Sequence, residues 1–249
     1  MIVYFSGTGN SKYVAERLAA ATNETAVSIE GLSADITLND GERLGLAVPT
    51  YFWELPAIVR EFLDKLTIKN AAGHYIYFVA TYGTTSGCIG EDAKRMFKNR
   101  GIELNGLFGV KMPDNWTPVF DLSDPEKVAK QNATAENYIN KAAELILKCE
   151  NGYFMANKAP FFISKLTGAL YEKERRAKKF YVEDSCIGCG LCAEKCPSQA
   201  IEMKEKKPVW IKECTLCLRC LHCCPKFAIQ YGSGKTKQHG QYTNPNVKL

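Results

Sequence analysis

The strongest constraint on this chain is a string of cysteines that occurs twice. Residues 186–197 follow the pattern CxxCxxCxxxCP, and residues 214–225 repeat it 28 positions later with the same trailing proline. The match continues into an Ala-Ile pair at residues 200–201 and 228–229. An internal repeat that carries the same cysteines predicts a duplicated unit with approximate two-fold symmetry.

Nine of the eleven cysteines in this 249-residue chain lie between Cys186 and Cys224. The first residues lack the basic leader and cleavage site of a signal peptide, and no apolar run is long enough to span a membrane. We therefore expect a cytoplasmic protein. In a reducing compartment, a dense cysteine block favours metal binding over disulfides.

Two metal chemistries use such cysteines. Three thiolates on a tight turn can wrap three irons of one cubane, while a fourth cysteine, beyond an extra residue and next to a proline, points away. A zinc ribbon also uses paired CxxC elements, but a tetrahedral site gives no reason for a third CxxC step or for the trailing CP in both repeats. We therefore expect two 4Fe-4S clusters.

The second string contains one cysteine too many, because Cys223 keeps the even spacing and directly precedes Cys224. The alignment with Cys196 and its proline selects Cys224 as the ligand. This choice leaves Cys223 as a free or packed thiol. His222 is expected to be a solvated loop residue rather than a ligand.

The first 150 residues alternate between short apolar runs and helical patterns. The expected strands span residues 2–5, 26–29, 44–48, 75–80 and 107–110. The expected helices span residues 11–21, 57–66, 91–99 and 125–148. Strands that alternate with helices predict a parallel, doubly wound α/β sheet, which binds ligands beyond the carboxyl ends of its strands.

A turn rich in glycine and hydroxyl groups follows the first expected strand and runs directly into a helix. Its residues are Ser6, Gly7, Thr8, Gly9, Asn10 and Ser11. Glycines permit the tight turn, and the hydroxyls and helix-start amides can donate to an anion, so the segment predicts a monophosphate site. It is not the GxGxxG dinucleotide fingerprint, because Lys12 stands where the third glycine would be.

The loops after the third and fourth expected strands suit a flat flavin ring, which needs aromatic faces for stacking and backbone groups at its edge. The candidates in the first loop are Pro49, Thr50, Tyr51, Phe52 and Trp53. Those in the second loop are Thr81, Tyr82 and Gly83. At least one aromatic residue is expected to pack between the domains instead, and Cys88 is expected to be a buried small side chain.

Residues 151–180 are expected to form a linker. Apolar side chains recur there at helical spacing, namely Phe161, Phe162, Ile163, Leu166, Ala169 and Leu170. We expect a linker helix that packs its apolar face on one of the domains; the alternative is a basic amphipathic segment that contacts a membrane or an acidic redox partner. Residues 181–232 would form the cysteine-rich domain, and residues 233–249 a polar tail that frays.

Charge is distributed unevenly between the two parts of the chain. Residues 1–150 carry 15 basic and 19 acidic side chains, a net of −4, whereas residues 151–249 carry 17 and 8, a net of +9. Two oxidised clusters of about −2 each would reduce the second figure to about +5. The basic excess is therefore partly internal compensation, and we expect no nucleic-acid partner.

These motifs carry a family resemblance. Ser6, Thr8, Gly9 and Ser11 match the phosphate loop of flavodoxins, and the cysteine strings resemble those of bacterial two-cluster ferredoxins. With the segment KMPDN at residues 111–115, the chain resembles the flavodoxin-ferredoxin fusion family of anaerobic microbes over nearly its whole length. One departure is that flavodoxins usually carry a glycine in the ring-contacting loop, whereas residues 50–55 contain none.

The resemblance implies a flavodoxin-like domain over residues 1–150, with five parallel strands in the order 2-1-3-4-5 and a bound FMN. It also implies a small α+β ferredoxin-like domain whose fourth cysteines cross between clusters. The first cluster would be held by Cys186, Cys189, Cys192 and Cys224. The second cluster would be held by Cys214, Cys217, Cys220 and Cys196.

The implied function is electron transfer between FMN, the two clusters and a redox partner protein. A second hypothesis is a flavin-dependent reductase that acts on a small substrate near Trp53 and Tyr82, with Glu54 as the nearest candidate acid. A third is a ferredoxin whose flavodoxin-like half only docks partners. We expect no membrane association and no direct nicotinamide binding. The sequence leaves the oligomeric state open, with a homodimer as one alternative.

Overall fold

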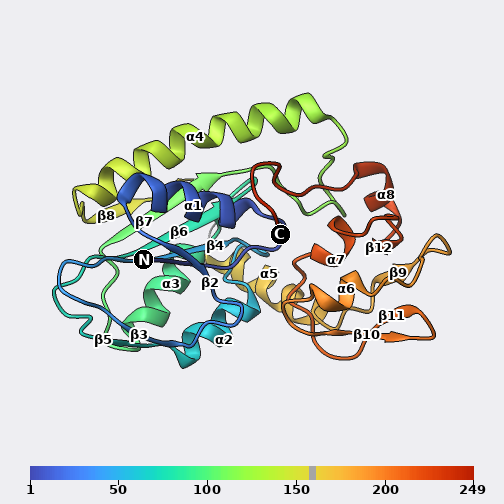
Figure 1. Cartoon of the computed structure of the whole chain (residues 1–249), viewed down its shortest axis with the longest axis horizontal. Coiled ribbons are helices and arrows are strands. Elements are labelled where there is room, and N and C mark those ends of the chain that lie inside the picture. Colours follow the sequence, from blue (N-terminus) through green and yellow to red (C-terminus); the bar gives the residue numbers. More distant parts are fainter. Residues whose placement is uncertain (157–160) are drawn as a thin grey trace.

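A computed structural model describes residues 1–156 and 161–249, and the side chains of all of these except residues 161–165. A six-stranded parallel sheet forms the centre of the amino-terminal half (Figure 1). In sheet order its strands are β2 (Ala26–Ser28), β1 (Ile2–Tyr4), β4 (Leu44–Pro49), β6 (Ile76–Tyr82), β7 (Gly106–Lys111) and β8 (Gly152–Phe154). The five expected strands are present in the expected order, so the doubly wound, flavodoxin-like fold is confirmed.

The expectation of five strands is wrong by one. The additional strand, β8, pairs in parallel with β7, with Leu107 opposite Tyr153. The sheet therefore continues past the boundary expected at residue 150. Strand β8 is short and begins with glycine, a residue that is depleted in strands, so its sequence pattern is weak. Short strands also form a second small sheet, in which β3 (Asp35–Thr37) pairs in parallel with β5 (Thr67–Lys69).

Helices cover both faces of the large sheet (Figure 1). One face carries α1 (Asn10–Thr22) and α4 (Pro125–Leu147), and the other carries α2 (Ala57–Lys65) and α3 (Ile89–Lys98). Successive side chains of a strand point to opposite faces, so in β4 the side chains of Leu46 and Val48 join the α2–α3 core while Ala47 joins the α1–α4 core. Helix α4 begins as the sequence predicts, because Asp124 caps it and proline follows at its first position.

The cysteine-rich half is built from two equivalent units. Strand β9 (Phe180–Val182) pairs antiparallel with β12 (Ile229–Tyr231), and β10 (Ile201–Lys204) pairs with β11 (Lys207–Trp210). The short helices α6 (Leu191–Glu194) and α7 (Arg219–His222) occupy equivalent positions in the two cysteine strings. The duplication seen in the sequence is therefore a duplication of structure.

The two halves share one hydrophobic core. Val3 and Val48 of the large sheet belong to the same cluster of buried residues as Leu218, Leu221 and Ile229 of the cysteine-rich half. Because burial of apolar surface is the main favourable term in folding, this continuous core holds the halves in one arrangement.

The linker contains the expected helix, α5 (Phe161–Glu174), but its buried face differs from the expected one. Leu166 and Leu170 are 73% and 46% exposed, whereas Tyr171 is fully buried. Tyr171 accepts a hydrogen bond from the Ala57 amide at 3.0 Å and donates one to the Thr215 carbonyl at 2.9 Å. The expected contacts of Phe161, Phe162 and Ile163 lie outside the described side chains. Within the described chain, no helix is both long enough and apolar enough to cross a membrane.

The expectation of a fraying tail is wrong. Residues 235–239 form α8 (Lys235–His239), and the chain then returns to the start of α1 (Figure 1). Thr236, Tyr242 and Asn244 are buried, with exposed fractions of 0%, 5% and 1%. Polar side chains can be buried in this way because each finds hydrogen-bond partners in the rest of the protein.

Candidate functional site

A cavity of about 280 Å³ opens at the carboxyl edge of the large sheet. The loops after β1, β4, β6 and β7 line it, as expected where parallel strands end together. The residues predicted for flavin binding that line it are Ser6, Gly7, Thr8, Asn10, Ser11, Pro49, Thr50, Tyr51, Phe52, Trp53, Thr81, Tyr82 and Gly83. Of the predicted set, Gly9 alone lies outside the lining, and it shapes the turn instead.

The phosphate loop is preorganised by its own contacts. Gly9 has φ of 103°, in the left-handed region that glycine adopts without strain, and its amide donates to the Ser6 hydroxyl at 3.0 Å. The next residue, Asn10, begins α1, so the first amides of that helix lie beside the cavity. Ser11 is held by a 2.8 Å hydrogen bond to the Thr81 hydroxyl. A helix start with adjacent hydroxyls suits a phosphate group.

The ring-contacting loop is a tight hairpin. Tyr51 and Glu54 exchange backbone hydrogen bonds of 3.1 and 2.9 Å around a two-residue turn. Both turn residues have left-handed backbones, with φ of 48° for Phe52 and 69° for Trp53. Such turns prefer Asn-Gly, so two large aromatic residues here store strain, which is typical of functional loops. Phe52 also stacks on Tyr171 at 5.2 Å, which ties the loop to α5.

Two buried hydroxyl groups in the cavity wall indicate that the cavity binds a polar ligand. In the described part of the chain, the buried hydroxyls of Thr50 and Tyr51 make no hydrogen bond within the protein. Both residues line the cavity. An unpaired buried hydroxyl is unfavourable, and a bound group with hydrogen-bonding edges would satisfy both. The cavity therefore fits a flavin mononucleotide by its phosphate loop, its aromatic wall and its unsatisfied hydroxyls.

Asp114 also lines the cavity, although it is not one of the residues predicted from the sequence. Burial raises the pKa of its carboxyl group to about 6, although its carboxylate accepts hydrogen bonds from the amides of Trp116 and Thr84. Its position could have been inferred, because it follows an expected strand at the same edge of the sheet. The earlier candidate acid, Glu54, does not line the cavity and lies 3.6 Å from Arg60.

Four of the predicted cluster ligands surround a small hollow in the cysteine-rich half. The hollow is lined by Cys186, Cys189 and Cys192 of the first string together with Cys224 of the second. These are the four cysteines that the crossed ferredoxin pattern assigns to one cluster. Cys223 does not line this hollow, and burial raises the pKa of its thiol.

Two of the other four predicted ligands, Cys214 and Cys217, are buried, whereas Cys196 and Cys220 are half-buried. Burial raises the pKa of the Cys214 and Cys217 thiols, and the pKa of Cys217 rises to about 11. The nearby Cys196 thiol raises both pKa values further. The Leu216 amide donates to the Cys214 sulfur at 3.2 Å, and the Ala200 amide to the Cys196 sulfur at 3.3 Å. Amide donors of this kind stabilise and tune cluster sulfurs.

Among the described residues, no three His, Cys, Asp or Glu side chains converge closely enough to hold one metal ion. A cube of four irons and four sulfides spreads its thiolate ligands farther apart than a tetrahedral zinc ion does. The four cysteines around the hollow are compatible with such a cluster.

The cysteine-rich half also forms part of the flavin cavity, which the sequence did not reveal. Leu216, Cys217 and Leu218 line the cavity beside the phosphate loop. A Cβ atom on Gly7 would lie only 2.9 Å from the Cys217 carbonyl oxygen. A glycine is thus required where the two halves meet.

His222 is not the solvated loop residue that was expected. It lies in α7 and is 5% exposed. One ring nitrogen accepts from the Tyr242 amide at 3.1 Å, so the other is free to donate to the Asn115 carbonyl at 3.0 Å. Burial lowers its pKa to about 4, so the ring is neutral at pH 7 and serves as a structural link. Cys88 is buried, as expected.

Comparison with known proteins agrees with this architecture. The flavodoxin domain family matches residues 1–141, and the 4Fe-4S binding domain family matches residues 180–202. An uncharacterized polyferredoxin-like protein of Methanocaldococcus jannaschii is 37% identical over 65 residues, which cover 20% of this chain and 39% of that protein. The chain thus spans about two fifths of the length of this relative.

Solved structures resemble the amino-terminal half. The two-electron reduced flavodoxin of Megasphaera elsdenii is 24% identical, with a TM-score of 0.36, over 54% of this chain and 97% of that chain. The Trp repressor binding protein of Bacillus subtilis is 13% identical, with a TM-score of 0.38, over 61% of this chain and 98% of that chain.

The flavodoxin family model covers more than half of the sequence, and the 4Fe-4S family model matches residues beyond it. The chain therefore belongs to the flavodoxin family, as a flavodoxin domain joined to a 4Fe-4S ferredoxin domain.

Proposed function

We propose that the protein transfers electrons between a bound FMN and two 4Fe-4S clusters, and from there to a redox partner. The observation that carries the proposal is the shared wall of the cavity, where Cys217 lies against the phosphate loop. Flavin exchanges one or two electrons and a cubane exchanges one, so together they can convert electron pairs to single electrons.

The two cysteine sets differ in their distance from solvent, which suggests an order of transfer. Cys214 and Cys217 are buried, and Cys217 lines the flavin cavity. Cys189 is exposed, and Ile187, two residues before it, is 59% exposed. The inner cluster would therefore exchange electrons with FMN, and the outer cluster would exchange them with the partner.

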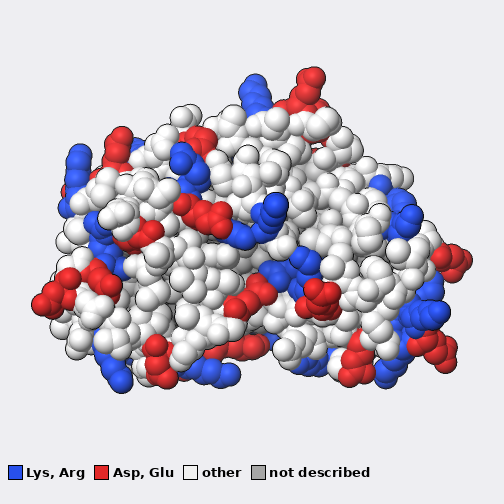
Figure 2. All heavy atoms as spheres, in the orientation of Figure 1, with Lys and Arg blue, Asp and Glu red and all other residues white. Residues whose placement is uncertain are grey.

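The partner is proposed to be a protein that docks near the outer cluster. On the face shown in Figure 2, basic and acidic side chains alternate, and neither kind forms a large patch. A face of mixed charge does not select a polyanion, so recognition there would depend on local features. Ile187 provides an exposed apolar side chain beside a candidate ligand, which suits a small, transient redox interface.

A flavin-dependent reductase is the second candidate, and Asp114 is the observation in its favour. A cavity carboxyl group with a pKa of about 6 can hold or release a proton near neutral pH. The reductase requires a substrate to reach the ring, whereas residues 216–218 already cover part of the cavity. We therefore place electron transfer first.

The test is anaerobic purification of the full chain, with iron, acid-labile sulfide and flavin counted per polypeptide. The proposal predicts about eight irons, about eight sulfides and one FMN. Cys186→Ser and Cys214→Ser form a matched pair, because each removes one ligand from one cluster. With reduced FMN as the electron source, rapid-mixing spectroscopy should show reduction of the remaining cluster in Cys186→Ser but not in Cys214→Ser. Equal cluster reduction in both variants would contradict the order of transfer.

A further inference from the structure

Arg219 occupies the junction between the two halves. It is 8% exposed and lies in α7 between the predicted ligands Cys217 and Cys220. Its Nε donates to the Gly7 carbonyl at 3.0 Å, and its Nη2 donates to the Ser6 carbonyl at 2.7 Å. The side chain thus reaches from the cysteine string to the backbone of the phosphate loop.

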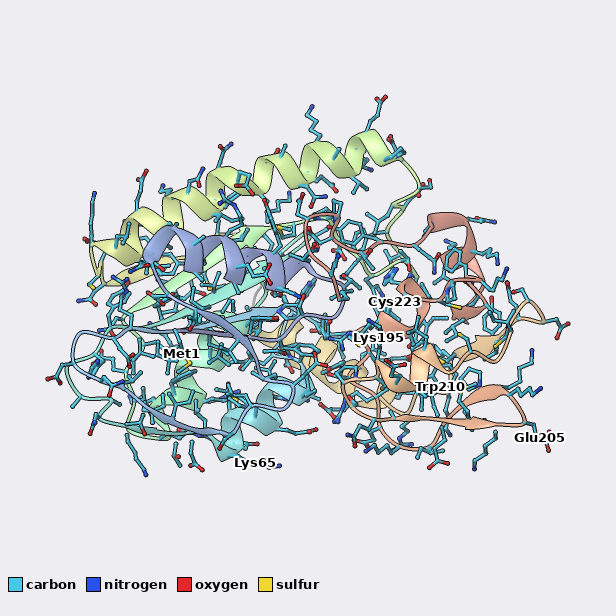
Figure 3. The ribbon with its side chains drawn as sticks, in the orientation of Figure 1. Met1, Lys65, Lys195, Glu205, Trp210 and Cys223 are labelled. Atoms are coloured by element: carbon cyan, nitrogen blue, oxygen red, sulfur yellow. The ribbon has the colours of Figure 1, made fainter. Side chains whose placement is uncertain are left out.

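The other donors of Arg219 complete a fixed network. Nη1 donates to the Lys195 carbonyl at 3.0 Å, and the two Nη atoms bind the two oxygens of Glu30 at 2.8 and 2.6 Å. Lys195 lies on the side of the cysteine-rich half that faces the sheet (Figure 3). The network contains five hydrogen bonds, which matches the five N–H groups of a guanidinium. A lysine has three donors and no planar fork, so it cannot reproduce this arrangement.

Arg219 connects two segments that would each hold an anion. The phosphate loop would hold a phosphate group, and the Cys214–Cys220 loop would hold a cluster that becomes more negative on reduction. Glu30 offsets part of the positive charge, but the Glu30 side chain is 31% exposed. The Arg219 side chain alone is 10% exposed. Because buried charges are screened less than exposed ones, the cation should dominate the local field.

We propose that Arg219 is a positioning residue that fixes the phosphate loop against the inner cluster, and that its charge raises the reduction potential of that cluster. This inference rests on the proposed function, because it requires both cofactors. It goes beyond that function by assigning the coupling between them to one side chain. The physical basis is that a fixed cation stabilises the more negative, reduced state of a neighbouring cluster.

The experiment uses the full chain, purified anaerobically, with Arg219→Gln and Arg219→Lys. Potentiometric titration followed by electron paramagnetic resonance measures both cluster potentials, and flavin fluorescence measures the FMN dissociation constant. Arg219→Gln should lower the potential of the inner cluster, leave that of the outer cluster unchanged and weaken FMN binding about tenfold or more. Arg219→Lys should keep the potential but also weaken FMN binding, because it retains the charge and loses the fork.

Arg17→Gln is the matched control. Arg17 pairs with Glu136 at 2.9 Å between α1 and α4, so this variant removes an arginine–carboxylate pair outside the junction. It should leave both potentials and the FMN dissociation constant unchanged. An inner-cluster potential that is the same in Arg219→Gln as in the wild type, with both cofactors bound, would overturn the proposal.

Glu30→Gln keeps the proposal testable if Arg219→Gln fails to assemble its clusters. This substitution leaves the cation in place and removes its counter-charge, so the inner-cluster potential should rise. A fall, or no change, would overturn the electrostatic role. Wild-type protein without flavin or iron would instead overturn the proposed function, so the two failures are distinguishable.

Discussion

The returning segment at residues 241–248 should strengthen FMN binding without touching the flavin ring. The Tyr242 hydroxyl donates to the Asn10 side-chain oxygen at 2.7 Å, and the side-chain amide of Asn244 donates to the same oxygen at 3.1 Å. The backbone amide of Asn244 donates to the Thr8 carbonyl at 2.8 Å. Asn10 and Thr8 both line the cavity, so this segment holds the phosphate loop from outside.

The perturbation is Tyr242→Phe, which removes one hydroxyl and keeps the ring. Tyr242 is 5% exposed, so water does not readily replace the lost hydrogen bond. A buried neutral hydrogen bond contributes about 1 kcal/mol, and Asn10 keeps its second donor, Asn244. If this hydrogen bond stabilises the phosphate-loop conformation that binds FMN, its loss should raise the FMN dissociation constant about fivefold.

The assay is fluorescence titration of flavin-free protein with FMN under anaerobic conditions, with cluster absorbance as a check of integrity. Tyr75→Phe is the control, since its hydroxyl donates to the Glu150 carbonyl and Tyr75 lies outside the flavin cavity. The control should lose comparable stability and keep the wild-type dissociation constant. The reasoning is refuted if Tyr242→Phe loses thermal stability as the control does while its affinity for FMN stays unchanged.

Three further substitutions test other parts of the site. Cys196→Ser should disturb the cluster of Cys214, Cys217 and Cys220 in paramagnetic spectra, and damage confined to the other cluster would contradict the crossed ligation. Gly7→Ala should reduce FMN affinity at least about tenfold in the same titration, because its Cβ would lie 2.5 Å from the Tyr51 hydroxyl and 2.9 Å from the Cys217 carbonyl. Asp114→Asn should alter the pH dependence of stability. Burial raises the pKa of Asp114 to about 6, so in the wild type its favourable contribution is present at low pH and is lost as pH rises towards and through 6. Thermal unfolding midpoints should therefore shift in favour of the variant between pH 4 and pH 7, and a constant difference would contradict the buried acid.

Local patterns in the sequence predicted the parts of the structure that local spacing determines. The strands β1, β4, β6 and β7 are apolar runs bounded by turns, and the phosphate loop is a short segment between a strand and a helix. The cysteine strings are also local, and their duplication predicted the paired helices α6 and α7. These features depend on neighbouring residues, so they could be read from the sequence.

The features that the sequence did not predict depend on contacts between distant residues. Residues 241–249 look like a frayed tail because they are polar, yet Asn244 is buried where Thr8 and Asn10 supply its hydrogen bonds. Helix α5 buries Tyr171 rather than Leu170, because the Tyr171 hydroxyl finds partners on α2 and on the second cysteine string. No local pattern reports such partners, since burial of a polar side chain depends on what lies opposite.

The way the two halves join favours a carrier over an enzyme that acts on small molecules. Separate redox proteins must meet before each transfer, and association costs several kcal/mol of translational and rotational freedom. Here the shared core and the network of Arg219 hold Cys217 beside the phosphate loop within one chain. The same contact closes part of the flavin cavity to other molecules. A protein built as a carrier gains from a permanent contact between its cofactor sites, whereas a reductase would gain more from open access to the ring.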